Sequence, residues 1–459
     1  MMGVLQEVAS LVGGRLHGED RAYGSVSTDT RTLQPGALFF ALQGPRFDGA
    51  QFVAAAAAGG AAGAVVPQRV ATSLPQIEVG DTLVALQVLG THWRRRFAGP
   101  LVAVAGSNGK TTVKEMTATI LASAGPTLAT LGNLNNHIGV PLTLLRLDAT
   151  VRAAVVELGA NRIGDVAQLM AFAQPTASVI TNAGAEHLEG FGDLDGVARG
   201  EGEAIGSLAA DGIAIINADD SYAGYWQQVA GERRTLRFGV RAPADFSASG
   251  VRHGIEDGEF LTRFTLGTPA GTAAIALHAG GAHNVLNALA AAAAASAAGA
   301  TLDDIVTGLG RFRPVGGRLQ LKPGLRGGWI IDDSYNANPS SVHAGLEVLR
   351  TLPRPTWVVL GEMAELGAAS VDAHRAAGTQ ARDCGVARLL CVGPTTPHAV
   401  AAFGDGAEWF ADVEALISRL RSELPAAVTL LVKGSRVNRL ERVVAAVARA
   451  AAATAAGVH

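Results

Sequence analysis

The chain has 459 residues, 48% of them hydrophobic and 17% charged, which supplies several packed cores and is too little charge for a disordered chain. The 37 basic and 40 acidic side chains give a net charge of −3, which argues against a nucleic-acid-binding surface. Two cysteines, Cys384 and Cys391, exclude a disulfide framework and are expected to be small core residues in a reducing cytoplasm.

The amino-terminal segment and the alanine tracts bear on location. MMGVLQEVASLVGG has no charged leader followed by a long apolar run, so no secretory signal is predicted. The tract near 288–300 is long and uninterrupted, but alanine is too weakly hydrophobic for a membrane span. We therefore expect a helix packed on a sheet there, no integral membrane segment, and a cytoplasmic protein.

The first block of the chain covers residues 1 to about 98. Short strands and turns are expected in STDTRTLQPGALFFAL, followed by an alanine-rich helix near 50–60 and a βα-like end. These patterns predict a small α/β domain.

A glycine-rich loop opens the second block, which runs from 99 to 313. LVAVAGSNGKTT places an apolar strand before the loop, and VKEMTATILASAG continues with apolar residues at helical spacing. Such a loop cradles phosphate: backbone N–H groups face the anion, Lys110 reaches the outer phosphates and Thr111 holds magnesium. A chance surface turn is the alternative, and the flanking strand and helix argue against it. The predicted nucleotide-binding residues are Gly106, Ser107, Asn108, Gly109, Lys110, Thr111 and Thr112.

The remainder of this block alternates strands with helices. AAVVELG, ASVITNAG and GIAIIN are strand-like, and helices are expected at 110–124, 163–173, 194–210 and 284–299. This alternation predicts a mostly parallel sheet covered on both faces. Ligands of such sheets sit beyond the carboxyl ends of the strands, where Glu157, Asn182 and then His187 fall.

Two kinds of ligand contact are predicted here. Thr111 and Glu157 would bind one magnesium ion. His187 would bind a second magnesium ion together with a further carboxylate. A salt bridge or helix terminus is the alternative for Glu157, and a satisfied loop histidine for His187. Asn284 and Asn287 lie three residues apart at the start of a predicted helix, where their amides could form hydrogen bonds to an adenine. Alternatively, Asn284 could cap that helix.

The third block, residues 314–459, follows a predicted hinge in RFRPVGGR. GWIIDDS, TWVVLGE, RLLCVG and VTLLVKGS each precede a helical pattern, which predicts a smaller doubly wound domain. Arg318, in the hinge, could clamp phosphates or be solvated. Either ligand contacts or turn and cap chemistry would explain the polar residues after the first strand, which are Asp332, Asp333, Tyr335, Asn336 and Asn338.

Together these motifs resemble the Mur ligase family, the ATP-dependent ligases of bacterial cell-wall synthesis, over essentially the whole chain. AGSNGKTT, GNLNNHIGVPLTLL, VVELGANRIGDVAQL, NAGAEHLEGFG, HNVLNAL, VGGRLQ and DDSYNANPSS follow in the family's order. HLEGFG, DDSYNANPSS, GEMAELG (Gly361–Gly367) and VKGSR (ending at Arg436) resemble the branch that joins D-alanyl-D-alanine to UDP-N-acetylmuramoyl-tripeptide.

The resemblance implies an α/β protein of three domains: a UDP-sugar-binding domain (1–98), a central P-loop ATPase domain (99–313) and a C-terminal Rossmann-like domain (314–459). It implies that ATP and Mg²⁺ convert the tripeptide carboxylate into an acyl phosphate, which the dipeptide amine attacks. A monomer is implied as well. The residues assigned by resemblance are Ser27, Thr30 and Arg31 to the uridine diphosphate, Asn336 and Asn338 to substrate, and Arg318 and Asp333 to the nucleotide.

One position departs from the family. Members often carry a carbamylated lysine, which binds the second magnesium, fourteen residues after the histidine of HLEGFG; here that position is Glu201. No lysine lies between Lys114 and Lys322. We expect Glu201, or Glu203 should the register slip, to supply the carboxylate directly, with a surface helix carboxylate as the alternative. Activity should then be independent of bicarbonate.

Three other functions would share part of these motifs: a Mur ligase that adds a single amino acid, an enzyme similar to folylpolyglutamate synthetase, and a non-catalytic nucleotide-dependent UDP-sugar-binding protein. The third-domain motifs disfavour the first, and STDTR would be unexplained by the second. The set of Lys110, Glu157 and His187 disfavours the third. Diaminopimelate and lysine both remain open as the third residue of the tripeptide.

Overall fold

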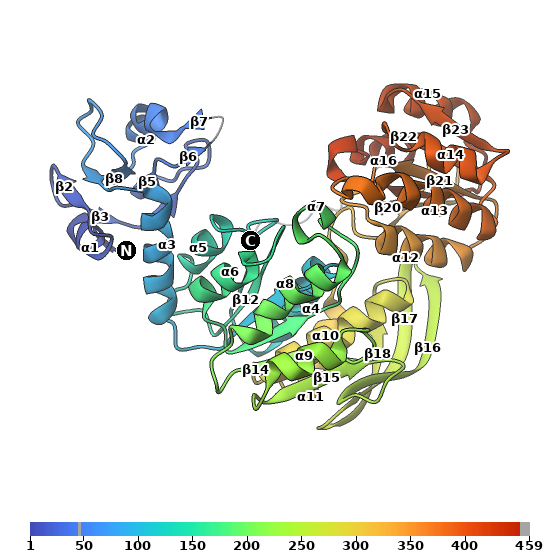
Figure 1. Ribbon diagram of the computed structural model, residues 1–459, viewed down its shortest axis with the longest axis horizontal. Coiled ribbons are helices and arrows are strands. Elements are labelled where there is room, and N and C mark those ends of the chain that lie inside the picture. Colours follow the sequence, from blue (N-terminus) through green and yellow to red (C-terminus); the bar gives the residue numbers. More distant parts are fainter. Residues whose placement is uncertain (45–46, 450–459) are drawn as a thin grey trace.

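Three α/β units follow one another along the chain, each built around its own sheet (Figure 1). The structure, a computed structural model, describes residues 1–44 and 47–449. The expected three-domain α/β architecture is confirmed, while the boundaries given for the domains stay predictions. Within the described residues, no helix has both the length and the apolar character needed to cross a membrane.

The N-terminal unit has a five-stranded sheet in the order β2-β9-β8-β5-β4. Its strands are β2 (Arg15–His17), β4 (Ser25–Ser27), β5 (Ala37–Phe40), β8 (Gly63–Val66) and β9 (Gln76–Glu78). The short pairs β1 (Gly3–Val4) with β3 (Ala22–Tyr23) and β6 (Gln43–Gly44) with β7 (Phe47–Asp48) stand apart from it. Its helices are α1 (Leu5–Leu11), η1 (Gly49–Phe52), α2 (Val53–Ala58) and α3 (Thr82–Arg95). Helix α3 runs down to the central unit (Figure 1).

The central unit has a nine-stranded sheet in the order β11-β12-β10-β13-β14-β15-β16-β17-β18. The pairs from β11 to β16 are parallel, and β16, β17 and β18 are antiparallel. The parallel strands are β10 (Leu101–Ala105), β11 (Thr127–Ala129), β12 (Ala153–Glu157), β13 (Ala177–Ile180), β14 (Ile213–Asn217) and β15 (Thr235–Gly239). The other three are β16 (Phe246–Glu256), β17 (Glu259–Thr268) and β18 (Gly271–Leu277).

Helices cover both faces of this sheet, as predicted. One face packs against α4 (Lys110–Ala124), α10 (Ala282–Ala297) and α11 (Leu302–Arg311). The other packs against α5 (Gly139–Leu144), α6 (Asp165–Ala173), α8 (Leu194–Gly206) and α9 (Ala223–Ala230), with α7 (Leu188–Phe191) beside them. The alanine tract lies in α10, where residues 288–295 are buried against the sheet; small side chains allow this close approach.

The antiparallel strands β16–β18 were not predicted. Their apolar residues alternate with exposed ones, as Phe264 and Leu266 are buried while Arg263 and Thr265 are exposed. This period-two pattern is spread over polar sequence such as HGIEDGEF, which does not form the continuous apolar runs that mark buried parallel strands.

The C-terminal unit has a six-stranded sheet in the order β19-β20-β24-β21-β22-β23, parallel except for β19. Its strands are β19 (Gln320–Pro323), β20 (Trp329–Asp333), β21 (Thr356–Gly361), β22 (Arg388–Val392), β23 (Ala407–Phe410) and β24 (Thr429–Lys433). Its helices are α12 (Pro339–Arg350), η2 (Gly367–Ala369), α13 (Ser370–Asp383), α14 (Pro397–Phe403), α15 (Val413–Glu423), η3 (Arg436–Asn438) and α16 (Glu441–Val447). Cys391 is buried in β22 and Cys384 is half-buried beside the same core.

Candidate active site

The glycine loop lies where β10 ends and α4 begins. β10 is fully buried between β12 and β13, so its carboxyl end is held at the middle of the sheet edge. Gly106 has φ +110° and Gly109 has φ +84°, a region that favours glycine. A Cβ on Gly106 would collide with Thr181, and one on Gly109 with Asn287. These glycines bring the chain into α4, whose first N–H groups have no partners within the helix.

Lys110 is held close to the loop. Its Nζ donates to the carbonyl oxygens of Gly106 at 2.5 Å and Ser107 at 3.0 Å, and to Glu186 Oε1 at 3.1 Å. Burial lowers the pKa of the Lys110 amine, but Glu186, Glu201 and Glu157 outweigh burial and raise that pKa above its ordinary value. Lys110 therefore carries a positive charge at the place where phosphate is expected.

A cavity of about 610 Å³ opens in front of the loop, between the central and C-terminal units. It is lined by six of the seven predicted loop residues, from Ser107 to Thr112. The other predicted site residues that line it are Glu157, His187, Asn284, Asn287, Arg318, Asp333, Asn336 and Asn338. One surface thus brings together residues of the central unit, the hinge and the C-terminal unit.

Glu157, the last residue of β12, has a carboxylate suited to a cation. Its Oε1 accepts from Asn135 Nδ2 at 2.8 Å, while its Oε2 is buried with no hydrogen-bond partner among the described residues. The Glu157 side chain and Thr111 both line the cavity. A buried carboxylate oxygen without a donor is costly unless a cation compensates it, so these two residues fit a magnesium ion beside the loop.

Glu201 lies under the loop on α8. Its carboxylate is buried and Oε2 accepts from the Gly106 N–H at 2.6 Å. Burial raises the pKa of Glu201 to about 7, against the lowering effect of Lys110. Glu201 does not line the cavity, and within the described part of the chain no cluster of three acidic, histidine or cysteine side chains could hold a metal. Its role as a metal ligand therefore stays a prediction, and the surface-carboxylate alternative is wrong. Glu203 instead accepts from the N–H groups of Gly164 and Ala167.

His187 precedes the short helix α7 with φ +48° and lines the cavity. Its Nδ1 lies 2.7 Å from Glu365 Oε2, a residue of the C-terminal unit. The structure therefore places His187 next to a carboxylate, but that carboxylate is Glu365, and Glu201 is bonded to Gly106 instead.

Asn284 and Asn287 lie in the first turns of α10 and are both buried. Asn287 Nδ2 donates to Asn284 Oδ1 at 3.0 Å, and Asn284 Nδ2 donates to Gly280 O at 2.8 Å. Gly281 holds the N-cap position, so the alternative that Asn284 caps the helix is wrong. The two amides form one hydrogen-bonded pair at the cavity surface.

Arg318 and Asp333 connect the hinge to both units. Arg318 donates to Thr111 Oγ1 at 3.3 Å, and its guanidinium lies 4.1 Å from the centre of the Tyr335 ring. Asp333 Oδ2 accepts from Lys433 Nζ at 2.5 Å and its Oδ1 from the N–H of Leu319 at 3.2 Å. Arg318 thus reaches the glycine loop, while Asp333 is engaged by protein groups within its own unit.

Asn338 has two roles in the structure. Its Oδ1 accepts from the Ser341 N–H at 2.9 Å as the N-cap of α12, and its Nδ2 donates to Asn108 Oδ1 at 2.8 Å. Asn336 Oδ1 accepts from the neighbouring Ala337 N–H at 2.9 Å. Cap chemistry therefore explains part of this motif, and Asn338 also connects it to the glycine loop.

The predicted uridine-diphosphate residues lie elsewhere, at the end of β4. Ser27 Oγ donates to Asp29 O at 3.0 Å, and Arg31 forms a bidentate pair with the Asp29 carboxylate. Neither Ser27, Thr30 nor Arg31 lines the cavity. Their contact with substrate stays a prediction for the N-terminal unit.

Several residues that line the cavity were not predicted as site residues, and three of them hold predicted ones in place. Glu186 pairs with Lys110, Lys433 pairs with Asp333, and Asn135 holds Glu157. Two signals were present in the sequence: Glu186 directly precedes His187, and Lys433, one of four lysines, ends a buried strand. The position of Asn135 depends on the conformation of the loop after β11, and the sequence of that loop has no hydrophobic periodicity from which its conformation could be predicted.

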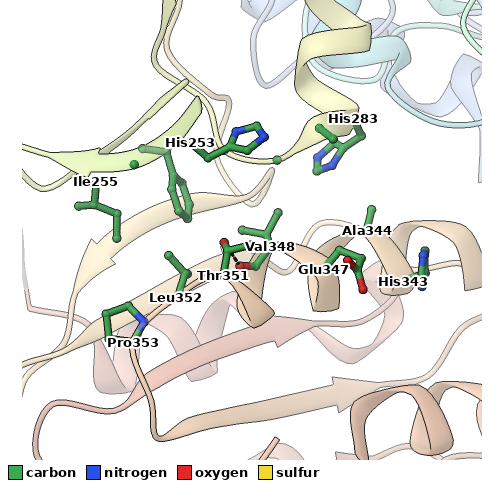
Figure 2. A pocket seen from close by; sticks show the side chains of 15 residues that line it. His253, Ile255, His283, His343, Ala344, Glu347, Val348, Thr351, Leu352 and Pro353 are labelled. Carbon is green, nitrogen blue, oxygen red and sulfur yellow. Dashed lines mark hydrogen bonds between the residues drawn. The ribbon is translucent and has the colours of Figure 1, made fainter. Parts of the chain in front are cut away.

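A second, mainly apolar cavity of about 530 Å³ lies between the hairpin of β16 and β17 and helix α12 (Figure 2). His283 lines both cavities. Burial lowers the pKa of His283 to about 4, against the raising effect of Asp333, so its ring is neutral at neutral pH. Figure 2 shows His253 and His283 on one side and Glu347 of α12 on the other.

A glycine loop with a charged lysine, a hydroxyl and an unpartnered carboxylate, facing a second domain across a cavity, defines an enzyme that transfers phosphoryl groups from a nucleotide. Three family models match the chain: the Mur ligase family catalytic domain at residues 22–108, the Mur ligase middle domain at 104–295, and the Mur ligase glutamate ligase domain at 317–436. The chain belongs to the Mur ligase family.

Named relatives are similar over nearly the full length. UDP-N-acetylmuramoyl-tripeptide–D-alanyl-D-alanine ligase of Escherichia coli is 44% identical, covering 96% of this chain and 97% of its own. A crystal structure of MurF from Acinetobacter baumannii has a TM-score of 0.88 and 33% identity, covering 96% and 98%. MurF of Thermotoga maritima, solved with ADP, has a TM-score of 0.81 and 26% identity, covering 92% and 96%.

Proposed function

We propose that this protein is the ligase that joins D-alanyl-D-alanine to UDP-N-acetylmuramoyl-tripeptide, with ATP converted to ADP and phosphate. The observation that carries this function is the similarity to E. coli UDP-N-acetylmuramoyl-tripeptide–D-alanyl-D-alanine ligase, which spans all three domains at 44% identity. The product is the UDP-linked pentapeptide precursor of peptidoglycan.

The residues of the cavity account for the first half of the reaction. The tripeptide carboxylate attacks the γ-phosphorus of ATP, the bond to the β-phosphate oxygen breaks, and an acyl phosphate and ADP form. Magnesium, for which Thr111 and Glu157 are the residues that fit, neutralises phosphate charge when bound. Lys110 and Arg318 supply further positive charge from the two sides of the cavity.

The second half of the reaction is amide formation. The dipeptide amine attacks the acyl carbon, phosphate leaves, and the amine loses its proton. Water would compete with the amine for the acyl phosphate, so a cavity closed between two domains protects the intermediate. Asn338 and Arg318, which reach from the C-terminal unit and the hinge to the glycine loop, provide contacts for that closure.

The remaining assignments belong to the same proposal. Asn284 and Asn287 contact the adenine ring, Asp333 orders the nucleotide side of the C-terminal unit, and Asn336 faces substrate. His187 and Glu201 are assigned to the second metal, which requires Glu201 to exchange its hydrogen bond with the Gly106 N–H for that ion. The protein is assigned to the cytoplasm, which suits two free cysteines because structural disulfides would mark an oxidising compartment, and a monomer is expected from the family resemblance.

Phosphate release by the purified protein tests this function. ATP, magnesium and UDP-N-acetylmuramoyl-tripeptide are supplied with and without D-alanyl-D-alanine, in parallel for the diaminopimelate and lysine tripeptides. We expect phosphate only with the dipeptide, matched by the pentapeptide product, and no change when bicarbonate is removed. Release with a single amino acid instead would assign the protein to another branch, and slow ATP turnover indifferent to any amine would indicate a non-catalytic nucleotide-binding protein.

A further inference from the structure

A fully buried lysine, Lys114, lies one helical turn after Lys110 on α4 and does not line the nucleotide cavity. Its Nζ donates to the carbonyl oxygen of Thr130 at 2.8 Å and forms an ion pair with Glu115 Oε1 at the same distance. A buried ammonium group is costly, and an apolar side chain of similar length would serve packing as well. The charged group therefore needs a reason beyond packing, and its contact with Thr130 supplies one.

Thr130, itself buried, directly follows β11, the strand at the edge of the central sheet. β11 pairs with β12 over residues 127–129, and the Thr130 N–H continues the pairing by donating to Val155 O at 3.1 Å. Thr130 Oγ1 accepts from the Glu157 N–H at 3.0 Å. Because an edge strand has a sheet neighbour on one side only, the hydrogen bond from Lys114 anchors the end of β11 from a second direction, that of α4.

The segment that begins at Thr130 holds Glu157 at two points. Thr130 Oγ1 binds its backbone N–H, and Asn135 Nδ2 donates to its Oε1 at 2.8 Å. Asn135 is fixed in turn, because its carbonyl oxygen accepts from the Gly159 N–H at 2.8 Å. These contacts leave Glu157 Oε2 as the buried oxygen without a partner among the described residues, and hence as the oxygen available to a cation.

We propose that Lys114 is a positioning residue for the magnesium ligand Glu157, acting through Thr130 and the loop that begins there. The inference rests on the proposed function, in which Glu157 binds the ion. Groups that orient a metal ligand strengthen binding because the ligand is already in place when the metal arrives. Helix α4 thus acts twice on the nucleotide: Lys110 in its first turn faces the phosphates, and Lys114 in its second turn supports the magnesium site.

Lys114→Met tests the inference, because methionine fills similar space without donating a hydrogen bond. We expect the Kd for magnesium, measured by calorimetry in the presence of ADP, to rise about 10- to 100-fold. The melting temperature of the ligand-free protein should stay close to that of the wild type, since a buried ion pair adds little stability. Thr117→Val is the matched control: it removes from the same helix a buried hydroxyl that has no partner among the described residues, and should bind magnesium as wild type does.

Two variants of Thr130 test the next step of the same path and do not depend on the folding of Lys114→Met. Thr130→Val keeps the shape of the side chain and removes the acceptor for the Glu157 N–H, so we expect magnesium binding to weaken about 10-fold. Thr130→Ser keeps the hydroxyl and should bind magnesium as the wild type does. Unchanged binding in Thr130→Val would overturn the inference.

A double variant separates positioning from a general structural effect. Lys114→Met added to Glu157→Gln should cause no further loss of magnesium affinity, because the group that Lys114 positions has already lost its charge. A full additional loss, or unchanged binding in Lys114→Met alone, would overturn the inference while Glu157→Gln by itself still weakens binding. Unchanged binding in Glu157→Gln would instead overturn the metal assignment within the proposed function.

Discussion

The two sides of the nucleotide cavity are built differently. On the central side, Glu157 and Glu201 are buried and Lys110 is half-buried, and all three are bonded within their own domain. On the other side, contacts reach across to the glycine loop from Arg318 at 3.3 Å and from Asn338 at 2.8 Å. The first side is organised before any ligand arrives, whereas the second depends on how the C-terminal unit lies against the loop.

This difference between the two sides indicates which of them acts on the chemical step and which on nucleotide binding. Buried charges that are already oriented stabilise phosphate charge without reorganisation. Each hydrogen bond between the domains contributes only about 1 kcal/mol, so closure is easily biased by a ligand. Substitutions on the central side should therefore affect chemistry strongly, and those on the C-terminal side should affect nucleotide binding in smaller steps.

Glu157→Gln should have the largest effect, because it keeps the shape of the side chain and removes the charge that faces the cation. We expect kcat/KM for ATP to fall about 1,000-fold, together with weaker magnesium binding measured by calorimetry in the presence of ADP. Ser178→Ala, on strand β13 of the same sheet, is the control and should retain activity. A fully active Glu157→Gln would show that the preorganised side does not hold the metal.

Arg318→Lys should come next. Lysine keeps the positive charge but loses the planar fork and its stacking on Tyr335, so we expect the KM for ATP to rise about 10-fold or more. Arg313→Lys, in the same hinge but paired with Glu259, should behave as wild type. Equal effects of both substitutions would mean that hinge charge, and not the contact with the loop, is what matters.

Glu201→Gln should change the pH dependence of stability. The pKa of Glu201 is about 7 in the folded protein against 4.5 ordinarily, so the folded state binds more protons between these values. The neutral Glu201 carboxyl therefore stabilises the folded state at low pH, and this stabilisation is lost as the pH rises through 7. We therefore expect the variant to gain roughly 1–3 kcal/mol over wild type between pH 5 and pH 8, measured by urea unfolding. A constant difference across that range would contradict the assignment.

Asn338 should give the smallest effects, and two variants separate its roles. Asn338→Asp keeps a good N-cap but removes the donor to Asn108, so we expect unchanged stability and a few-fold higher KM for ATP. Asn338→Ala removes both and should cost about 1 kcal/mol in addition. Equal melting temperatures of the two variants would show that the cap contributes nothing.

The sequence was most informative where structure is local. The continuous apolar runs ending at Ala105, Glu157 and Ile180 became buried parallel strands, and the helix predicted over 110–124 is α4. Spacing also placed the glycine loop and the asparagine pair at the cavity. These features depend on contacts within one strand–loop–helix unit, which periodicity reports directly.

Contacts between distant segments could not be read in that way. Asn108 and Asn338 are 230 residues apart, and neither motif indicates that the two side chains form a hydrogen bond. Glu201 was placed by counting along a family motif, yet its carboxylate bonds to the Gly106 N–H because α8 packs beneath the loop. The antiparallel hairpins were missed since half of their residues face solvent.

The scarcity of lysine has a practical consequence. Lys110, Lys114 and Lys433 have side chains that are 14%, 0% and 3% exposed, whereas Lys322 is 35% exposed. Lys322 lies on β19, the first strand after the hinge. Among the four lysines, an amine-reactive fluorophore would therefore react in preference at Lys322, which places a dye close to the hinge without any engineered cysteine.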